Sequence, residues 1–138
     1  MANLLNFFGE VSRMLIVLLV AAWLLICHEL GHILTTVALG GRFQGVVFRG
    51  FALGVVLDLS RLSMRGRLGT VWAGVGAEMA ATGAVGVLAG MGFLDMRLFA
   101  WALIMLAADA TLNLGPWWSA SDGALIRQWR HVAQGERG

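Results

Sequence analysis

The chain has 138 residues, of which 59% are hydrophobic and only 13% are charged, and its mean hydropathy is +0.79. In soluble domains about a quarter of the residues are charged, so this composition argues against a soluble globular protein and indicates a lipid bilayer as the environment. All ten basic residues are arginines. They are scattered, and several flank apolar runs as membrane-topology signals do, which argues against a nucleic-acid partner. We expect one membrane-embedded domain over residues 1–138.

The first expected element is a membrane-spanning helix over about residues 11–39. Residues 14–27 contain no charged side chain. At 1.5 Å per residue the helix would be about 40 Å long, enough to cross a bilayer with tilt. A secretory signal peptide is the alternative, but the apolar run is long and has no small-residue cleavage site. Gly40 and Gly41 are expected to end the helix, because glycine is common just past a helix C-terminus.

Two short β-prone runs follow at residues 43–49 and 51–59, both rich in Val and Phe. We expect them to form a β-hairpin over 43–59 with its turn around Gly50. Such a hairpin would either pack as a loop between two spans or offer its edge to an extended peptide. The residue pattern is compatible with both roles.

Two further spans are expected over about residues 68–93 and 98–114. Small residues at spacings of three and four predict a close-packing face on the second span: Gly76, Ala80, Gly83, Gly86 and Gly90. Gly115-Pro116 interrupts the third span, since proline cannot continue the helical hydrogen bonds. A break over 115–121 and a terminal helix over about 122–133 complete the chain. The expected fold class is an all-α integral membrane protein with about three transmembrane helices and a small β-hairpin between the first and second.

The distribution of arginines predicts the orientation of these spans. The loop between the first two spans and the C-terminal segment together hold most of the arginines, whereas the opposite side has only Arg13 and Arg97. Arginine-rich loops stay on the cytoplasmic side of a membrane. We therefore expect an integral protein of a prokaryotic plasma membrane, with its N-terminus outside and its C-terminus cytoplasmic.

The sequence His28-Glu29-Leu30-Gly31-His32 lies within the first span. On a helix, two histidines four residues apart project from one face and can bind one Zn²⁺, and the glutamate after the first can act as general base toward a zinc-bound water. The alternative is a set of polar residues that bond to neighbouring helices, which would be costly at membrane depth. Cys27 is read as a buried apolar residue, because adjacent helical residues point about 100° apart.

A catalytic zinc needs a third protein ligand and an open position. The candidate carboxylates are Asp58, Glu78, Asp95, Asp109 and Asp122. Ordinary solvation explains Asp58 and Asp95, which lie at a strand end and in a short loop, and His131 lies in a basic stretch typical of a solvated helix face. Glu78 and Asp109 are intramembrane, and Asp122 follows the Gly-Pro break. On residue type and position alone, each of these three residues remains a candidate third ligand.

A family resemblance bears on this choice. The HELGH pentapeptide, together with Asn113-Leu114-Gly115-Pro116 and Ser121-Asp122-Gly123, resembles the motifs of the site-2 protease family of intramembrane zinc metalloproteases. The resemblance implies that His28, His32 and Asp122 bind one zinc ion per chain and that Glu29 is the catalytic base. It also implies that Asn113 positions the substrate carbonyl or stabilises the oxyanion.

The resemblance covers nearly the whole chain, because the order helix, hairpin, helix, helix is similar to the three-helix core of that family. The segment Ala73-Gly74-Val75-Gly76-Ala77-Glu78 is similar to a family stretch that usually reads Ala-Gly-Pro-x-Ala-Asn. Val75 and Glu78 depart from that pattern, as does Ser121, where the family usually has leucine. Glu78 is therefore kept as a reserve ligand.

The function expected from these features is zinc-dependent hydrolysis of peptide bonds in transmembrane segments of membrane-protein substrates. Two alternatives stay open: a membrane zinc-binding protein without proteolytic activity, and a structural or transport subunit whose intramembrane charges line a path. With so few spans, self-association or a partner subunit is compatible with the sequence.

Overall fold

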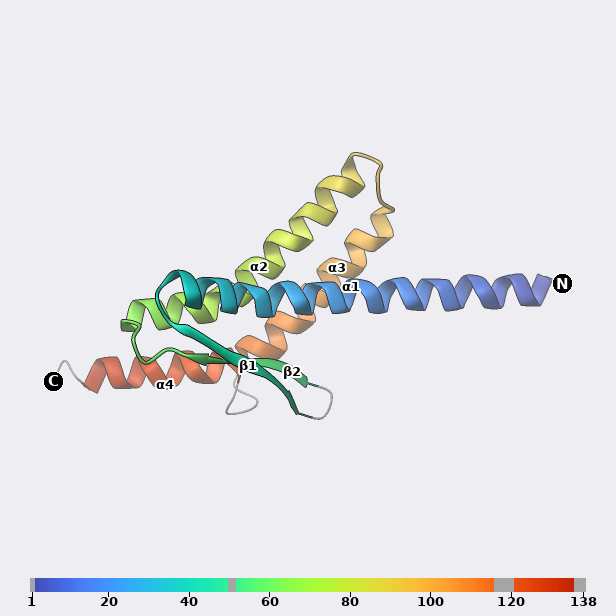
Figure 1. Cartoon of the computed structure of the whole chain (residues 1–138). Coiled ribbons are helices and arrows are strands. Elements are labelled where there is room, and N and C mark those ends of the chain that lie inside the picture. The colour runs from blue at the N-terminus through green and yellow to red at the C-terminus, as the bar shows by residue number, and fades with distance from the viewer. Residues whose placement is uncertain (1, 50–51, 116–120, 136–138) are drawn as a thin grey trace.

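The computed structural model describes residues 2–49, 52–115 and 121–135, and within them it is mostly helical. The described elements, in chain order, are α1 (Ala2–Ala38), β1 (Arg42–Arg49), β2 (Ala52–Asp58), α2 (Met64–Gly90), α3 (Met96–Leu114) and α4 (Asp122–Gly135). Figure 1 shows α2 and α3 as a helical pair that crosses α1, with the hairpin and α4 near the C-terminal half of α1. A mostly helical fold with one small hairpin between its first two long helices is confirmed.

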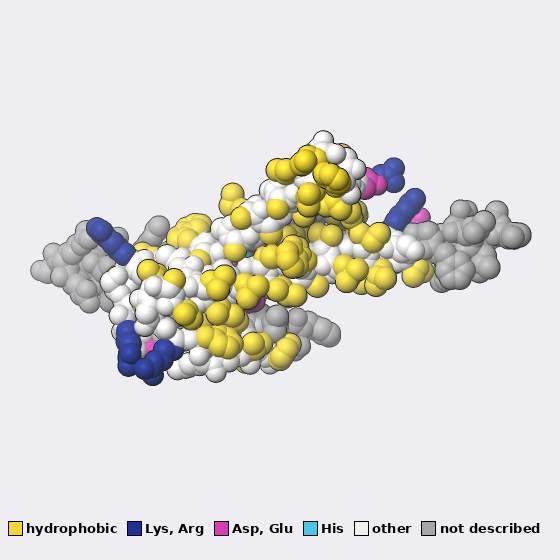
Figure 2. All heavy atoms as spheres, turned by 45° about the horizontal axis from the view of Figure 1, so that its top comes forward, with side chains coloured by type: hydrophobic (Ala, Val, Ile, Leu, Met, Phe, Trp, Pro, Cys, Tyr) yellow, Lys and Arg dark blue, Asp and Glu magenta, His cyan; other side chains and the backbone are white. Residues whose placement is uncertain are grey.

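Three of the described helices are long and apolar enough to cross a membrane: Glu10–Ala38 within α1, and the whole of α2 and α3. Large apolar side chains along them are exposed, among them Leu18, Met79 and Ile104. Figure 2 shows such side chains spread over the molecule, with dark-blue arginines gathered at its ends. A soluble protein rarely exposes so much contiguous apolar surface. The structure is therefore consistent with a membrane protein.

Polar caps make α2 and α3 begin before the expected spans, whereas α2 ends at Gly90 and not at the expected residue 93. Ser63 precedes α2 and its hydroxyl accepts a hydrogen bond from the amide of Gly66 at 3.2 Å, so the helix begins at Met64. Asp95 caps α3 in the same way through the amide of Arg97 at 2.8 Å. Side chains of this type satisfy amides that the first helical turn leaves unpaired. Hydropathy detects only the apolar part of a helix, which explains the earlier starts.

Glycines end α1 as expected. Gly40 has a φ of 89°, and the amide of Gly41 donates to the carbonyl of Thr36 at 2.9 Å. This 6→1 bond is the Schellman ending, which needs a residue that tolerates a left-handed backbone. At the other end of the fold, α3 stops at Leu114 and Gly115 is extended. The expected proline break at Pro116 lies outside the described residues.

The hairpin pairs β1 with β2 in antiparallel register, from Arg42 opposite Asp58 to Arg49 opposite Ala52, with a bulge between Phe43 and Gly45. Its strands therefore start and end within one or two residues of the expected runs. The turn expected around Gly50 lies outside the described residues. Both strands contact α1, which places the hairpin beside the helix that contains the HELGH sequence (Figure 1).

Helices α1 and α2 are in close contact at Gly31. A methyl group on Gly31 would overlap the backbone carbonyl of Ala73 and lie 2.8 Å from the Cβ of Ala77. Gly31 lies between the two histidines of the motif, and it must be small because α2 passes directly over it. Close contact of this kind is how small residues favour association of membrane helices.

The close-packing face predicted for α2 from its small residues is wrong for most of those residues, because they do not pack against another described element. Gly76, Ala80, Gly83 and Gly90 are exposed, and of the five only Gly86 meets another element, the ring of Phe99 in α3. The buried face of α2 instead contains polar side chains at a spacing of four, Thr70, Glu78 and Thr82, with Gly74 between the first two. Small residues fit on either side of a helix, so their spacing alone did not show which side is buried.

Candidate metal centre

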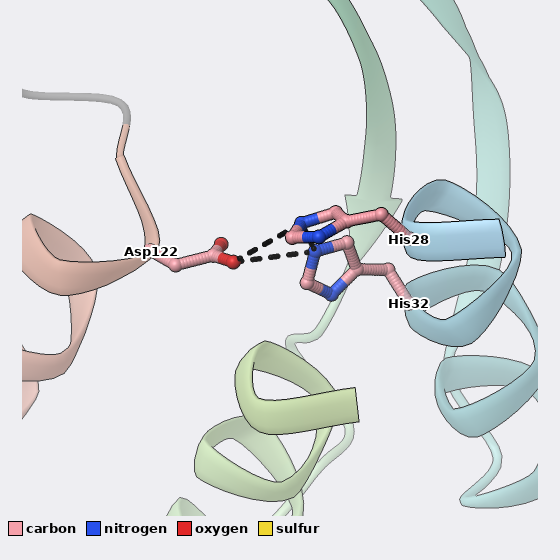
Figure 3. Close-up of side chains that lie close together, drawn as sticks. All are labelled: His28, His32 and Asp122. Atoms are coloured by element: carbon pink, nitrogen blue, oxygen red, sulfur yellow. Dashed lines mark hydrogen bonds and ion pairs between the residues drawn. The ribbon is translucent and has the colours of Figure 1, made fainter. Parts of the chain in front are cut away.

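The two histidines of the motif lie side by side on the inner face of α1. His28 is 2% exposed and His32 is 7% exposed, and their Nε2 atoms are 3.0 Å apart. Residues four apart in an α-helix share a face, so this convergence follows from the spacing in the sequence. Both imidazoles point from α1 toward Asp122 at the start of α4 (Figure 3).

Asp122 approaches the same two nitrogen atoms from the first residue of α4. Its Oδ2 lies 3.3 Å from Nε2 of His32 and 3.5 Å from Nε2 of His28 (Figure 3). Asp122 and the histidines are about ninety residues apart in the chain, so only the packing of α4 brings them together. The structure thus places His28, His32 and Asp122 in one group that could hold a metal ion.

Two neighbours of Asp122 fix the start of α4. The hydroxyl of Ser121 donates to the carbonyl of Gly115 at 2.8 Å and accepts from the amide of Ala124 at 3.2 Å, so it both caps α4 and ties it to the end of α3. A methyl group on Gly123 would overlap the carbonyl of Leu114. Ser121 and Gly123 therefore hold Asp122 at a close junction between the two helices.

The spacing of the three candidate ligand atoms is close to that expected around one metal ion. Zinc binds nitrogen and oxygen at about 2.0–2.2 Å, so the ligands of a tetrahedral site lie about 3.3–3.6 Å apart. The two distances from Oδ2 of Asp122, 3.3 and 3.5 Å, fall in this range, whereas the two Nε2 atoms are closer together, at 3.0 Å. In addition, Oδ2 of Asp122 is buried and has no hydrogen-bond partner within the described part of the chain. A cation would satisfy this oxygen and separate two nitrogen atoms that otherwise face each other.

Gly74 of α2 leaves the space beside these nitrogens open. A methyl group on Gly74 would overlap the imidazole of His32 and lie 2.7 Å from Nε2 of His28. Any larger side chain at this position would occupy the space in front of the two Nε2 atoms. The absence of a Cβ at Gly74 is the third feature that suits a bound ion.

The far nitrogen of each imidazole is already engaged. Nδ1 of His32 lies 2.7 Å from the backbone carbonyl of Thr70, and Nδ1 of His28 lies 3.2 Å from Oδ2 of Asp109 and 3.5 Å from Oε2 of Glu78. Because a carbonyl and an ionised carboxylate only accept, these contacts place the ring hydrogen on Nδ1. Each Nε2 then presents its lone pair to the site, as in histidines that bind metals.

Glu29 and Asn113 lie next to this group without belonging to it. Glu29 is half-buried on α1, directly after His28. Asn113 donates from Nδ2 to Oδ2 of Asp109 at 2.8 Å. Its amide nitrogen is thus directed along α3, and the expected role of Asn113 toward a substrate stays a prediction.

Asp122 is the one expected ligand outside the three spans, and its electrostatic environment favours the charged form. Burial opposes ionisation of Asp122. When His28 and His32 are protonated, their hydrogen bonds and positive charges outweigh burial and hold the pKa of the Asp122 carboxyl below its usual value. A carboxylate that remains ionised is the form that binds a metal.

The remaining candidates are placed elsewhere or differently. Asp58 accepts from the amide of Ser60 at 3.0 Å and Asp95 caps α3, so both have local structural roles. Cys27 is partly buried and does not belong to either metal-capable group of the described residues. The side chain of His131 lies outside the description. Glu78, the reserve ligand, forms with His28 and Asp109 the second of those groups.

Comparison with models of known protein families and with curated proteins finds no match to this chain. The resemblance to site-2 proteases therefore rests on the sequence motifs alone.

Sequence reasoning did not assign roles to Thr70 and Gly74, which contact the histidines, and it considered Asp109 only as a candidate third ligand. Thr70, Gly74 and Glu78 follow one another at a spacing of four, which on a helix is a single face. The polar residues Thr70 and Glu78 on one face of an apolar span could have indicated its buried side, since polar side chains in a membrane helix face protein rather than lipid. No comparable row of polar residues on α3 indicated that Asp109 would contact His28.

Proposed function

We propose that this chain is an intramembrane zinc metalloprotease of the site-2 protease type. The observation that supports this most directly is the convergence of His28, His32 and Asp122 inside a group of membrane-length helices, beside Glu29. Two histidines and one carboxylate are a ligand set of catalytic zinc sites, which keep one position open for water or substrate. A structural zinc site usually has four protein ligands.

Bound zinc would supply a Lewis acid that polarises the scissile carbonyl and lowers the pKa of water at the open position. His28, His32 and Asp122 would hold the ion. Glu29 would take a proton from the attacking water, whose oxygen bonds to the carbonyl carbon. When the carbon–nitrogen bond breaks, Glu29 would return that proton to the leaving nitrogen. The net reaction is hydrolysis of one peptide bond.

The hairpin is the surface best suited to hold an unwound substrate segment. A transmembrane helix must expose its carbonyls before hydrolysis, and an extended peptide can then pair with the edge of a sheet. The sheet has two strands, so each strand has one edge with no pairing partner among the described residues. Phe43, Val46 and Phe48 are exposed on β1, which suits an apolar substrate.

The orientation proposed for the protein follows from its arginines. Arg42, Arg61 and Arg65 are exposed near the hairpin and the start of α2, whereas Arg13 and Arg97 are exposed near the opposite ends of α1 and α3. The arginine-rich side would be cytoplasmic. The site would then lie toward the cytoplasmic half of the bilayer, because the histidines are in the C-terminal half of α1.

The test compares cells that express the wild-type chain, Glu29→Gln, or the control Glu10→Gln. Glu10 is on the same helix but is exposed and pairs only at the surface with Arg13 at 3.3 Å. A membrane protein should accumulate uncleaved with Glu29→Gln and be processed normally with the other two. Purified wild-type and Glu10→Gln chains should then cleave that protein in proteoliposomes.

Glu29→Gln should retain zinc, because Glu29 is not among the proposed ligands. Cleavage at an equal rate by Glu29→Gln would contradict the proposed mechanism. If the wild-type chain binds zinc but cleaves no membrane protein, the result would instead support a zinc-binding protein without proteolytic activity.

A further inference from the structure

Two carboxylates and one amide lie behind His28, on the side away from the proposed zinc. Oδ2 of Asp109 is 3.2 Å from Nδ1 of His28, and Oε2 of Glu78 is 3.5 Å from the same atom. Glu78 is 1% exposed. Asn113 donates to Oδ2 of Asp109 at 2.8 Å. Four side chains from three helices therefore form one connected polar cluster at membrane depth.

We propose that Asp109 is a positioning residue that orients His28 for zinc and is itself held in place by Asn113. This inference rests on the proposed zinc site. Metal-binding histidines generally donate their other ring N–H to a carboxylate or carbonyl, which fixes the tautomer and makes the ligand nitrogen more basic. For His32 the acceptor is the carbonyl of Thr70. For His28, two carboxylates face Nδ1, and the nearer is Asp109 at 3.2 Å, with Glu78 at 3.5 Å.

Asp109 rather than Glu78 is assigned as the main acceptor for two reasons. The single hydrogen on Nδ1 of His28 serves one strong acceptor, and Asp109 is the nearer carboxylate. Asp109 also accepts a hydrogen bond from the amide of Asn113 at 2.8 Å, one helical turn further along α3, and this contact fixes its carboxylate. An acceptor whose own position is fixed orients the ring more effectively.

The same cluster could instead bind a second cation through Nδ1 of His28, Glu78 and Asp109. That arrangement requires His28 to bind metal through both nitrogens, so the ring would have to lose both of its N–H hydrogens. A neutral imidazole has one N–H and one acceptor nitrogen. The positioning role therefore predicts one zinc ion per chain, and the second-site alternative predicts two.

This role gives Asn113 a function that does not involve a substrate. Asn113 lies one helical turn after Asp109 on α3, and its amide nitrogen points back to that carboxylate. If it acts by holding Asp109, its replacement should weaken zinc binding in the absence of any substrate. If it acts only on the substrate, the affinity for zinc should not change.

The test measures zinc affinity of the purified full-length chain in detergent by competition with a chromophoric chelator, and records the visible spectrum after Co²⁺ substitution. The variants are Asp109→Asn, Asn113→Ala and the double replacement. The control is Asp95→Asn, which changes the exposed cap of the same helix to a residue that caps equally well. Thermal unfolding of the metal-free forms checks that each variant folds.

Asp109→Asn should weaken zinc binding about 10- to 100-fold and shift the Co²⁺ absorption bands, while metal-free stability changes little. Asn113→Ala should act in the same direction with a smaller effect. The double replacement should equal Asp109→Asn alone, because two residues that act through one contact are not additive. Asp95→Asn should behave as wild type.

Each contrary result has its own meaning. A wild-type chain that binds no zinc would overturn the proposed function itself. A wild-type chain that binds one zinc, with Asp109→Asn of equal affinity and spectrum, would overturn only the positioning role. Two zinc ions per chain, with one lost in Glu78→Gln, would show that the carboxylates are ligands and would also overturn it.

Discussion

Gly74 and His32 face each other across the contact between α2 and α1 so closely that a methyl group on Gly74 would overlap the imidazole ring. The same methyl group would lie 2.7 Å from Nε2 of His28. Gly74 therefore keeps open the space into which both ligand nitrogens point. This contact links a glycine in the second span to the metal chemistry proposed for the first.

Gly74→Ala should weaken zinc binding, because the added methyl group displaces the histidines or fills the ion's place. Overpacking typically costs about 1–3 kcal/mol, which corresponds to roughly 5- to 150-fold in affinity. Gly76→Ala is the matched control, since a methyl group there meets nothing within 4 Å and the residue is exposed. Chelator competition on both purified variants measures the effect. Equal affinities would refute the role given to Gly74.

Removal of the metal should destabilise the wild-type chain. A ligand that binds only the folded state stabilises it by about 4 kcal/mol when present at a thousand times its dissociation constant, so chelation should lower the unfolding temperature by on the order of 10 °C. Asp122→Ala should already be less stable and should respond little to chelator. Thermal unfolding in detergent, with and without chelator, measures both. An identical response from the two proteins would argue against Asp122 as a ligand.

Gly123→Ala should displace Asp122 from the histidines. A methyl group on Gly123 overlaps the carbonyl of Leu114, so α4 must move away from α3 to accommodate it. Zinc content of the purified variant should fall below that of wild type. Gly69→Ala is a suitable control because a methyl group there has no neighbour within 4 Å. Full zinc occupancy in Gly123→Ala would show that the junction tolerates the shift.

The proposed orientation can be tested with single cysteines in a Cys27→Ala background. Ser60 is exposed in the loop before α2, and Phe93 is 71% exposed in the loop before α3. With the N-terminus outside, a membrane-impermeant thiol reagent should label Phe93→Cys in intact cells and should label Ser60→Cys only after lysis. The reverse pattern would place the hairpin outside and contradict the arginine-based orientation.

The sequence predicted the main architecture because the bilayer imposes strong patterns. A long apolar run identifies a membrane-length helix, and histidines four apart on such a helix must share a face. The caps at Ser63 and Asp95 were missed because they lie outside the apolar runs. The packing face of α2 was wrongly assigned because glycines at Gly76 and Gly83 are compatible with either side of a helix.

The surroundings of the histidines were harder to predict. The contacts of His28 with Asp109 and of His32 with Thr70 join residues far apart in the chain, and they depend on how α2 and α3 pack against α1. Asp122 was expected through the resemblance to a protease family rather than through any local pattern. Gly74 was quoted in that resemblance, but its role depends on a distance between helices that no single helix determines.

The zinc content of the purified protein tests the central claim most directly. Elemental analysis of the full-length chain in detergent should find one zinc per wild-type chain and one in Glu29→Gln, but almost none in Asp122→Ala. Asp95→Asn, an exposed acidic residue outside the site, should retain one. A wild-type chain without zinc, or an Asp122→Ala chain that keeps it, would contradict the metal centre proposed for His28, His32 and Asp122.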